Sequence, residues 1–138
     1  MDIKKLSIGT IAGAIVFFLL GWLVYDKLLA DFMRQHPGER GLIGRTEIKF
    51  VYLIAGQVLE GLLLTYILLK SNVNSLAGGL IMGAVVGFLM CAAIDFTMYG
   101  TSVIMSKKGL AADVLAATVI SAVAGAVIGA LTGGSKNS

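Results

Sequence analysis

Long apolar segments alternate with short polar ones along the whole chain. The apolar segments cover residues 6–25, 50–69, 76–97 and 114–132. Each holds about the 20 residues that a helix needs to cross a hydrocarbon core roughly 30 Å thick. The pattern therefore predicts an all-α fold, a bundle of four transmembrane helices in up-down antiparallel order, with helices over about 6–26, 48–70, 75–100 and 110–133.

The composition favours a membrane protein over a soluble helical bundle. The 138 residues are 57% hydrophobic and only 14% charged, whereas soluble domains average roughly 25% charged residues. Helices of a soluble bundle keep one polar face, but segments 11–25 and 114–131 are apolar on every side. We expect a single transmembrane domain over 1–138, in contact with the lipid bilayer.

The connection after the first predicted helix is long enough to hold a further helix. Residues 27–36 place Leu28, Leu29, Phe32 and Met33 on one side and polar residues around the other. This spacing is typical of a short helix lying in the membrane interface. The two later connections are short, so the second and third helices, and likewise the third and fourth, should form antiparallel hairpins.

Basic residues are divided unequally between the two sides of the membrane. The first and third connections carry Lys27, Arg34, Arg40, Arg45, Lys49, Lys107 and Lys108, and the opposite side carries Lys4, Lys5, Lys70 and Lys136. The positive-inside rule therefore predicts that both termini lie outside. The net charge of +3 comes without a dense basic and aromatic face, so we expect no nucleic-acid partner.

Glu60 is the most unusual residue of the chain. It lies in the middle of the second apolar segment, and none of the apolar segments contains a Lys or Arg. A charged residue at a bilayer centre costs roughly 2.5 to 3.5 kcal/mol on insertion scales, which makes such residues functional candidates. Gln57 shares the helical face of Glu60, and Thr118 and Ser121 of the fourth helix lie at a matching depth.

Two interpretations of Glu60 remain open at this point. In the first it is a structural, protonated acid that shares hydrogen bonds with Gln57 and Ser121, because desolvation favours its neutral form. In the second it binds a proton or a cation reversibly.

A second acidic group is expected near the membrane face that holds the first and third connections. This interfacial acidic cluster consists of Asp26, Asp95 and Asp113. We favour an anchoring role in which the carboxylates pair with Lys107 and Lys108. A metal site formed with His36 is less favoured, because no ligand spacing repeats. We therefore predict neither a metal nor a cofactor.

Small residues recur at four-residue spacing in the last two predicted helices. The third helix contains Gly79, Gly83 and Gly87, and the fourth contains Gly125 and Gly129 after Ser121. Such rows let helix backbones approach closely inside a membrane. We favour packing within one chain over a homo-oligomer interface, although a homo-oligomer or a larger membrane complex is an expected partner arrangement.

The sequence contains no recognisable catalytic motif. There is no Gly-x-Ser-x-Gly or His-Glu-x-x-His pattern, and the only histidine lies beside a proline in a connection. The single cysteine, Cys91, is expected to pack as a small apolar group. We therefore predict that the protein is not an enzyme.

The chain resembles an uncharacterised family of small bacterial four-helix integral membrane proteins. Its members carry an Asp-Leu-Thr-Asn motif in helix three and an Asp-x-x-Trp-Gly-Thr motif at the start of helix four. Asp95, Phe96 and Thr97 match the first motif, and Asp113 and Thr118 align with the second. The resemblance implies a four-helix fold in the bacterial cytoplasmic (inner) membrane, and it implies no particular activity.

Two functions follow from these observations. The first is a non-enzymatic helical module or accessory subunit of a membrane complex, in which Glu60 is part of the scaffold. The alternative is a proton-coupled transporter of a small molecule or cation, in which Glu60 is the shared site for proton and substrate.

Overall fold

The computed structural model describes residues 1–41 and 44–133, and within these ranges the chain is all-α. The helices are α1 (Ile3–Gly21), the π-helical η1 (Trp22–Leu28), α2 (Ala30–Gln35), α3 (Phe50–Lys70), α4 (Leu76–Thr101) and α5 (Lys107–Thr132). Among the described residues, four helical stretches are long and apolar enough to cross a membrane, namely α1 with η1, α3, α4 and α5. The predicted fold class is confirmed, and the chain is a small polytopic membrane protein.

Some predictions fall outside the described residues. Residues 42–43 and 134–138 belong to the predicted domain over 1–138, and Lys136 enters the count of basic residues, but these positions are not among those described. The single-domain assignment and the membrane orientation both stay predictions.

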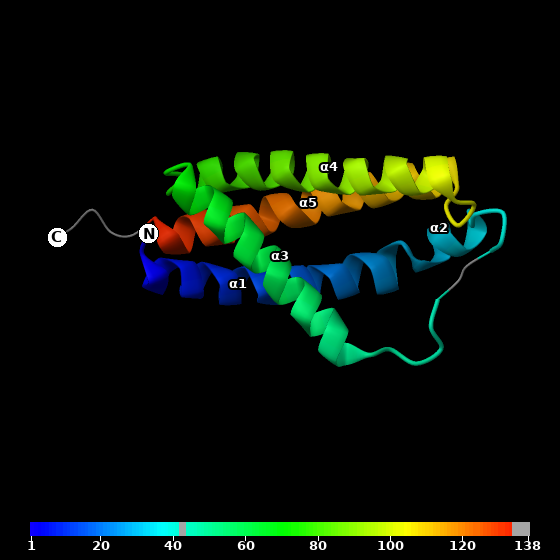
Figure 1. Cartoon of the computed structure of the whole chain (residues 1–138), viewed down its shortest axis with the longest axis horizontal. Helices are drawn as coiled ribbons and strands as arrows, with labels where there is room; N and C mark the ends of the chain where they lie inside the picture. The colour runs from blue at the N-terminus through cyan, green and yellow to red at the C-terminus, as the bar shows by residue number, and fades with distance from the viewer. Residues whose placement is uncertain (42–43, 134–138) are drawn as a thin grey trace.

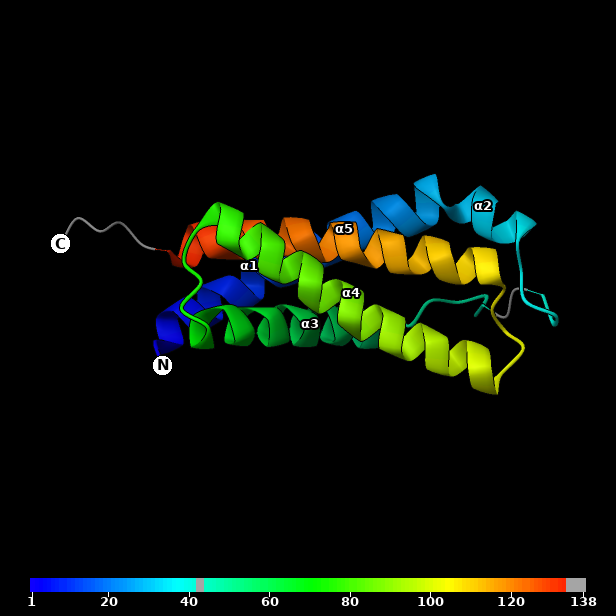
Figure 2. The ribbon, with the colours of Figure 1, turned by 90° about the horizontal axis from the view of Figure 1, so that it is seen from above.

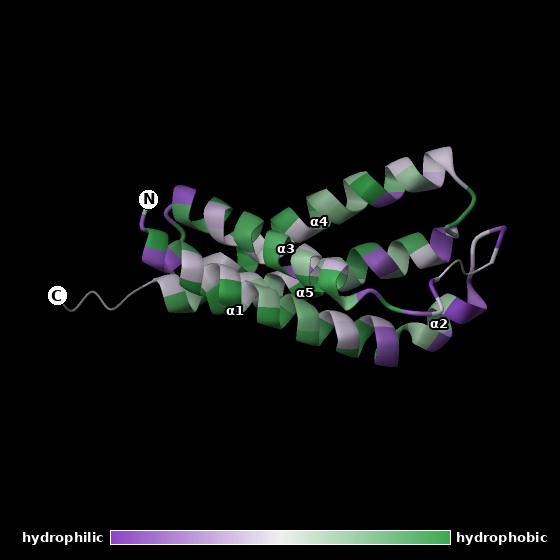
Figure 3. Cartoon of the chain, turned by 60° about the horizontal axis from the view of Figure 1, so that its bottom comes forward, coloured by the Kyte–Doolittle hydropathy of each residue, from purple (hydrophilic) through white to green (hydrophobic). Residues whose placement is uncertain are grey.

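The outer surface of the bundle matches a lipid environment. Hydrophilic residues concentrate at the two ends of the bundle and in the connections (Figure 3), with isolated hydrophilic positions inside the helices. Large apolar side chains such as Ile11, Leu59 and Ile81, each 63% exposed, point away from the protein interior. In water this surface would be costly, whereas a bilayer covers it.

The long helices pack in two close pairs. α4 packs along α5, α1 packs against α3, and α1 also contacts α5. The turn over residues 71–75 joins α3 to α4, but the two helices diverge from it, and α3 crosses the bundle obliquely (Figure 1). The predicted hairpin of the second and third helices is therefore correct in chain direction and wrong in packing, because α3 finds its partner in α1.

Glycines set the α4–α5 pairing. A Cβ atom on Gly79 would collide with the carbonyl oxygen of Gly125, one on Gly83 would collide with the carbonyl oxygen of Ser121, and one on Gly87 would collide with the Ser121 side chain. Gly129 meets the backbone of the turn before α4 in the same way. The glycines of α4 and α5 therefore contact each other's helices within one chain, which is the arrangement that we favoured from the sequence.

The α1–α3 contact depends on a second set of small residues. A Cβ on Gly61 would meet the backbone of Thr10 and Ala14, and Gly9 faces the buried side chain of Thr65. These contacts involve the middle and the last part of α3. The first part of α3 leaves α1 at an angle.

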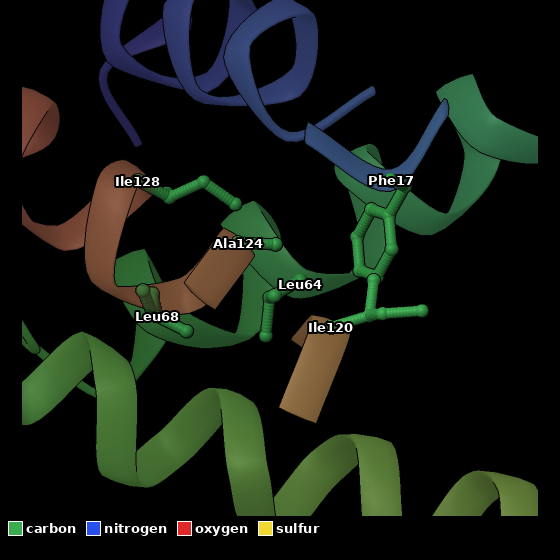
Figure 4. Packing of buried hydrophobic residues seen from close by; sticks show 6 residues of the cluster. All are labelled: Phe17, Leu64, Leu68, Ile120, Ala124 and Ile128. Atoms are coloured by element: carbon green, nitrogen blue, oxygen red, sulfur yellow. The ribbon is translucent and has the colours of Figure 1, made fainter. Parts of the chain in front are cut away.

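The hydrophobic core lies where α1, α3 and α5 meet. Figure 4 shows its buried members, which are Phe17, Leu64, Leu68, Ile120, Ala124 and Ile128. Leu68, Ala124 and Ile128 are fully inaccessible to solvent. The core extends from Phe17 in the second half of α1 to Leu68 and Ile128 in the last parts of α3 and α5.

The first and third connections meet at one end of the bundle. Pro37 and Met105 form an isolated β-bridge, and the Ser106 hydroxyl donates a hydrogen bond to the carbonyl of His36. α2 lies just before this contact, where the short helix after the first span was predicted (Figure 2). The two connections therefore lie on one side of the bundle, as the up-down topology requires.

Candidate functional site

A pocket of about 670 Å³ opens where α3 departs from α1. Its walls come from the end of α1, from η1, from the first half of α3 and from the middle of α5. The residues that line it are Phe17, Phe18, Gly21, Trp22, Tyr25, Asp26, Ile48, Phe50, Leu53, Gln57, Glu60, Ala117, Ile120 and Ser121. The lining is thus mostly aromatic and aliphatic, with a small number of polar groups.

The pocket brings together three of the four residues predicted for the proton or cation site. Glu60 and Gln57 line it from α3, and the buried Ser121 lines it from α5. Thr118 does not line it, and its hydroxyl donates instead to the carbonyl of Val114 at 2.7 Å. Within the described chain, Glu60 forms no hydrogen bond with Gln57 or Ser121, so the shared hydrogen bonds of the structural interpretation are not formed.

Glu60 lies at the midpoint of α3, and its side chain is exposed in the isolated chain on the side of the pocket. The position corresponds to the middle of a candidate membrane span. Acidic residues at that depth are rare and face the bundle interior or a water-filled cavity, so Glu60 is a functional candidate.

The π-helical turn η1 shapes one wall of the pocket. The amide of Leu29 donates to the carbonyl of Val24 at 2.7 Å, a bond to the fifth residue before it instead of the fourth. The wider turn changes the angular spacing of the side chains after Gly21, and Trp22, Tyr25 and Asp26 all line the pocket. Such π-turns occur often at functional sites.

A polar group lies behind this wall, between η1, α4 and α5. The hydroxyl of Tyr25 donates a hydrogen bond to the carboxylate of Asp113. The Cys91 thiol donates to the carboxylate of Asp95 across 3.5 Å, and Asp95 is only 3% exposed. Tyr25 also lines the pocket, so its side chain connects the pocket with the half-buried Asp113 and, beside it, the buried Asp95.

Cys91, Asp95 and Asp113 each offer a ligand atom within 4.8 Å of the others. One thiol and two carboxylates can hold a cation in principle, or they can share protons. His36 does not join them, since its ring stacks on Phe32 and its Nδ1 lies 2.9 Å from the Phe32 carbonyl oxygen. The grouping with His36 considered from the sequence is therefore not formed.

The interfacial acidic cluster divides into two parts. Asp95 and Asp113 come together, whereas Asp26 lines the pocket with its carboxylate 3.7 Å from the Lys27 ammonium. In the described ranges the other ion pair is that of Asp31 with Arg34. The expected pairing of the aspartates with Lys107 and Lys108 is therefore wrong. Asp95 is buried inside the bundle and Asp113 accepts a hydrogen bond from Tyr25, whereas the two lysines are exposed at the start of α5.

Sequence reasoning missed several residues of the site. Trp22 and Tyr25 look like interfacial aromatic residues by position alone, and Cys91 looks like an apolar packing residue. The four-residue spacing of Cys91 and Asp95 was a usable signal, since it puts both on one helical face. No comparable signal links Tyr25 to Asp113, which are 88 positions apart.

Comparisons of the chain with protein-family models, with curated proteins and with solved structures find no match. The resemblance around Asp95 and Asp113 therefore has no matching family model, and the architecture of long apolar helices is what the structure supports. Any function has to be argued from the pocket itself.

Proposed function

We propose that the protein is a proton-coupled transporter of a small molecule, without enzymatic activity, in which Glu60 binds proton and substrate alternately. The observation that carries the proposal is that Glu60, Gln57 and Ser121 line one open pocket at the middle of the membrane spans. Following the resemblance stated above, we place it in the bacterial cytoplasmic membrane.

The size and lining of the pocket support this proposal. A volume of about 670 Å³ lies within the roughly 300 to 1,000 Å³ of small-molecule sites, which are mostly apolar with a few polar groups that orient the ligand. Gln57 supplies a hydrogen-bonding group from α3 and Ser121 supplies one from α5. Glu60 supplies the titratable group, and membrane-embedded acids in transporters commonly carry protons.

Substrate transport is coupled to proton transport if the substrate and the proton cannot bind Glu60 at the same time. A substrate that needs the ionised carboxylate displaces the proton, and a proton that neutralises the carboxylate releases the substrate. The groups that surround the pocket are Tyr25 and Asp26 on η1, Asp113 behind Tyr25 on α5, and Asp95 with Cys91 on α4. None of these is a base that could neutralise Glu60 permanently.

Proton release on substrate addition tests the proposal. Full-length protein in weakly buffered liposomes is exposed to a panel of cationic, neutral and anionic small molecules, and a pH dye reports released protons. We expect release with at least one class of compound, loss of the signal in Glu60→Gln, and an unchanged signal in Glu39→Gln, which alters an exposed acid outside the pocket. No release with any class, or equal release from Glu60→Gln, would refute the proposal.

A second candidate is a non-enzymatic helical module or accessory subunit. It is favoured by the open first part of α3, where Val51 is 78% and Tyr52 is 75% exposed and Gly56 has open space around it. A helix of another protein, or of a second copy, has room there. This function predicts that Glu60→Gln is nearly silent, so the same proton measurement separates the two candidates.

A further inference from the structure

We infer that the pocket takes a hydrophobic organic cation, an inference that rests on the proposed function because it names the substrate class of the same site. The pocket combines aromatic side chains with two carboxylates, and its lining contains no Lys, Arg or His. The carboxylates disfavour anions, and the aromatic lining disfavours hydrated metal ions.

The charges select a cation over an anion. Glu60 lines the pocket from α3, and Asp26 lines it from η1. Of the basic residues beside the lining in sequence, Lys27 pairs with Asp26. Arg45 and Lys49 line a separate hollow that shares only Ile48 with the pocket. An anion entering the pocket would meet like charges in a setting of low dielectric constant, where their repulsion is strong.

The aromatic residues select an organic cation over a hydrated metal ion. Phe17, Phe18, Trp22, Tyr25 and Phe50 contribute to the walls, and ring faces attract weakly hydrated cations. Trp22 already interacts with a cation of its own chain, since the Lys27 ammonium lies 5.2 Å from a ring centroid. Hard metal ions need about six to eight oxygen ligands, which this largely apolar lining does not supply.

The volume selects a cation with several rings or alkyl arms. About 670 Å³ is far more than a single small ammonium group fills, and the apolar walls favour ligands that bury apolar surface. A cation with bulky hydrophobic substituents meets both the Glu60 carboxylate and the walls.

The fluorescence of Trp22 can report ligand binding in this pocket. Trp22 is the single tryptophan of the sequence, and it lines the pocket. Full-length protein in phosphatidylcholine nanodiscs is titrated with tetraphenylphosphonium and with tetraphenylborate, which match in size and shape and differ in the sign of their charge. Empty nanodiscs and a Trp22→Phe variant correct for partition into lipid and for background signal.

We expect tetraphenylphosphonium to change the Trp22 emission saturably, and tetraphenylborate to leave it unchanged beyond partition. Glu60→Gln should weaken cation binding about tenfold or more, because the charge–charge attraction between the cation and the carboxylate is lost, while Glu39→Gln should bind normally. In the wild type, lowering the pH should weaken binding, because a proton neutralises the carboxylate that the cation requires. This wild-type comparison holds even if Glu60→Gln does not fold.

Equal or tighter binding of tetraphenylborate would overturn the cation assignment. If a neutral or anionic compound, and no cation, releases protons through Glu60, the substrate class is wrong and the proposed function stands. If cations bind without any proton release, the substrate class stands and the proposed coupling is wrong. If neither ion binds saturably and Glu60→Gln releases protons as the wild type does, both fail.

Discussion

Tyr25 and Asp113 link the surface of the pocket to the interior of the bundle. The phenol hydroxyl reaches from η1 to a carboxylate on α5, and Asp95 lies next to that carboxylate with 3% of its surface exposed. In the described part of the chain no basic side chain pairs with Asp95 or Asp113. Two nearby carboxylates repel each other when both are charged, so the hydrogen bond from Tyr25 should matter for their stability.

Removal of the Tyr25 hydroxyl tests this contact. Tyr25→Phe should lower the free energy of unfolding by about 1 kcal/mol, because a hydrogen bond to a carboxylate is lost at a partly exposed position. Tyr99→Phe is the matched control, since the Tyr99 hydroxyl makes no hydrogen bond within the described residues. Thermal or denaturant unfolding in micelles measures both, and equal stability of the two variants would show that the contact contributes nothing.

At the scale of helices, small residues decide which surfaces meet. α4 approaches α5 through glycines whose missing side chains make room for the partner backbone. In lipid no hydrophobic force drives helices together, so close backbone approach and van der Waals contact must do so. α3 lacks such a row on the side of α4 and pairs instead with α1 at Gly61.

Replacing a glycine by alanine should destabilise the protein where the glycine contacts another helix, and should have little effect where the glycine has open space around it. Gly83→Ala should lower the unfolding free energy by about 1 to 3 kcal/mol, because the added carbon overlaps the Ser121 backbone and forces α4 away from α5. Gly100→Ala, at an open position of the same helix, should be neutral or slightly stabilising, since alanine is the better helix former. Unfolding in detergent checks the pair, and similar losses in both would contradict this packing.

At the scale of the whole molecule, the first and third connections lie together and the turn before α4 lies at the opposite end (Figure 1). The spans are long enough to separate these two ends across a bilayer. The excess of basic residues in the first and third connections predicts that this end is cytoplasmic.

Cysteine labelling in cells tests that topology. On a Cys91→Ala background, Ser71→Cys in the turn before α4 should react with a membrane-impermeant maleimide in intact cells. Glu39→Cys in the first connection should react only after permeabilisation. The reverse pattern would overturn the predicted orientation and keep the number of crossings, whereas labelling of both from one side would contradict the four-span arrangement.

The candidate site was partly predictable from the sequence. Counting residues along two helices was enough to bring Glu60, Gln57 and Ser121 to one pocket, because the rise per residue sets the approximate depth of each position along its helix. It was not enough to place Thr118, whose hydroxyl donates to its own helix, or Tyr25, whose hydroxyl reaches Asp113 from the π-helical η1. Rotation about the helix axis is a tertiary property.

The sequence by itself determined which four segments are long and apolar enough to cross a membrane, because partition of an apolar segment into lipid depends mainly on that segment. The tertiary structure alone decided that α3 pairs with α1, that α4 pairs with α5, and that a pocket opens between them. These outcomes depend on how closely backbones distant in sequence can approach each other, and that closeness is set by the shapes of both partners together.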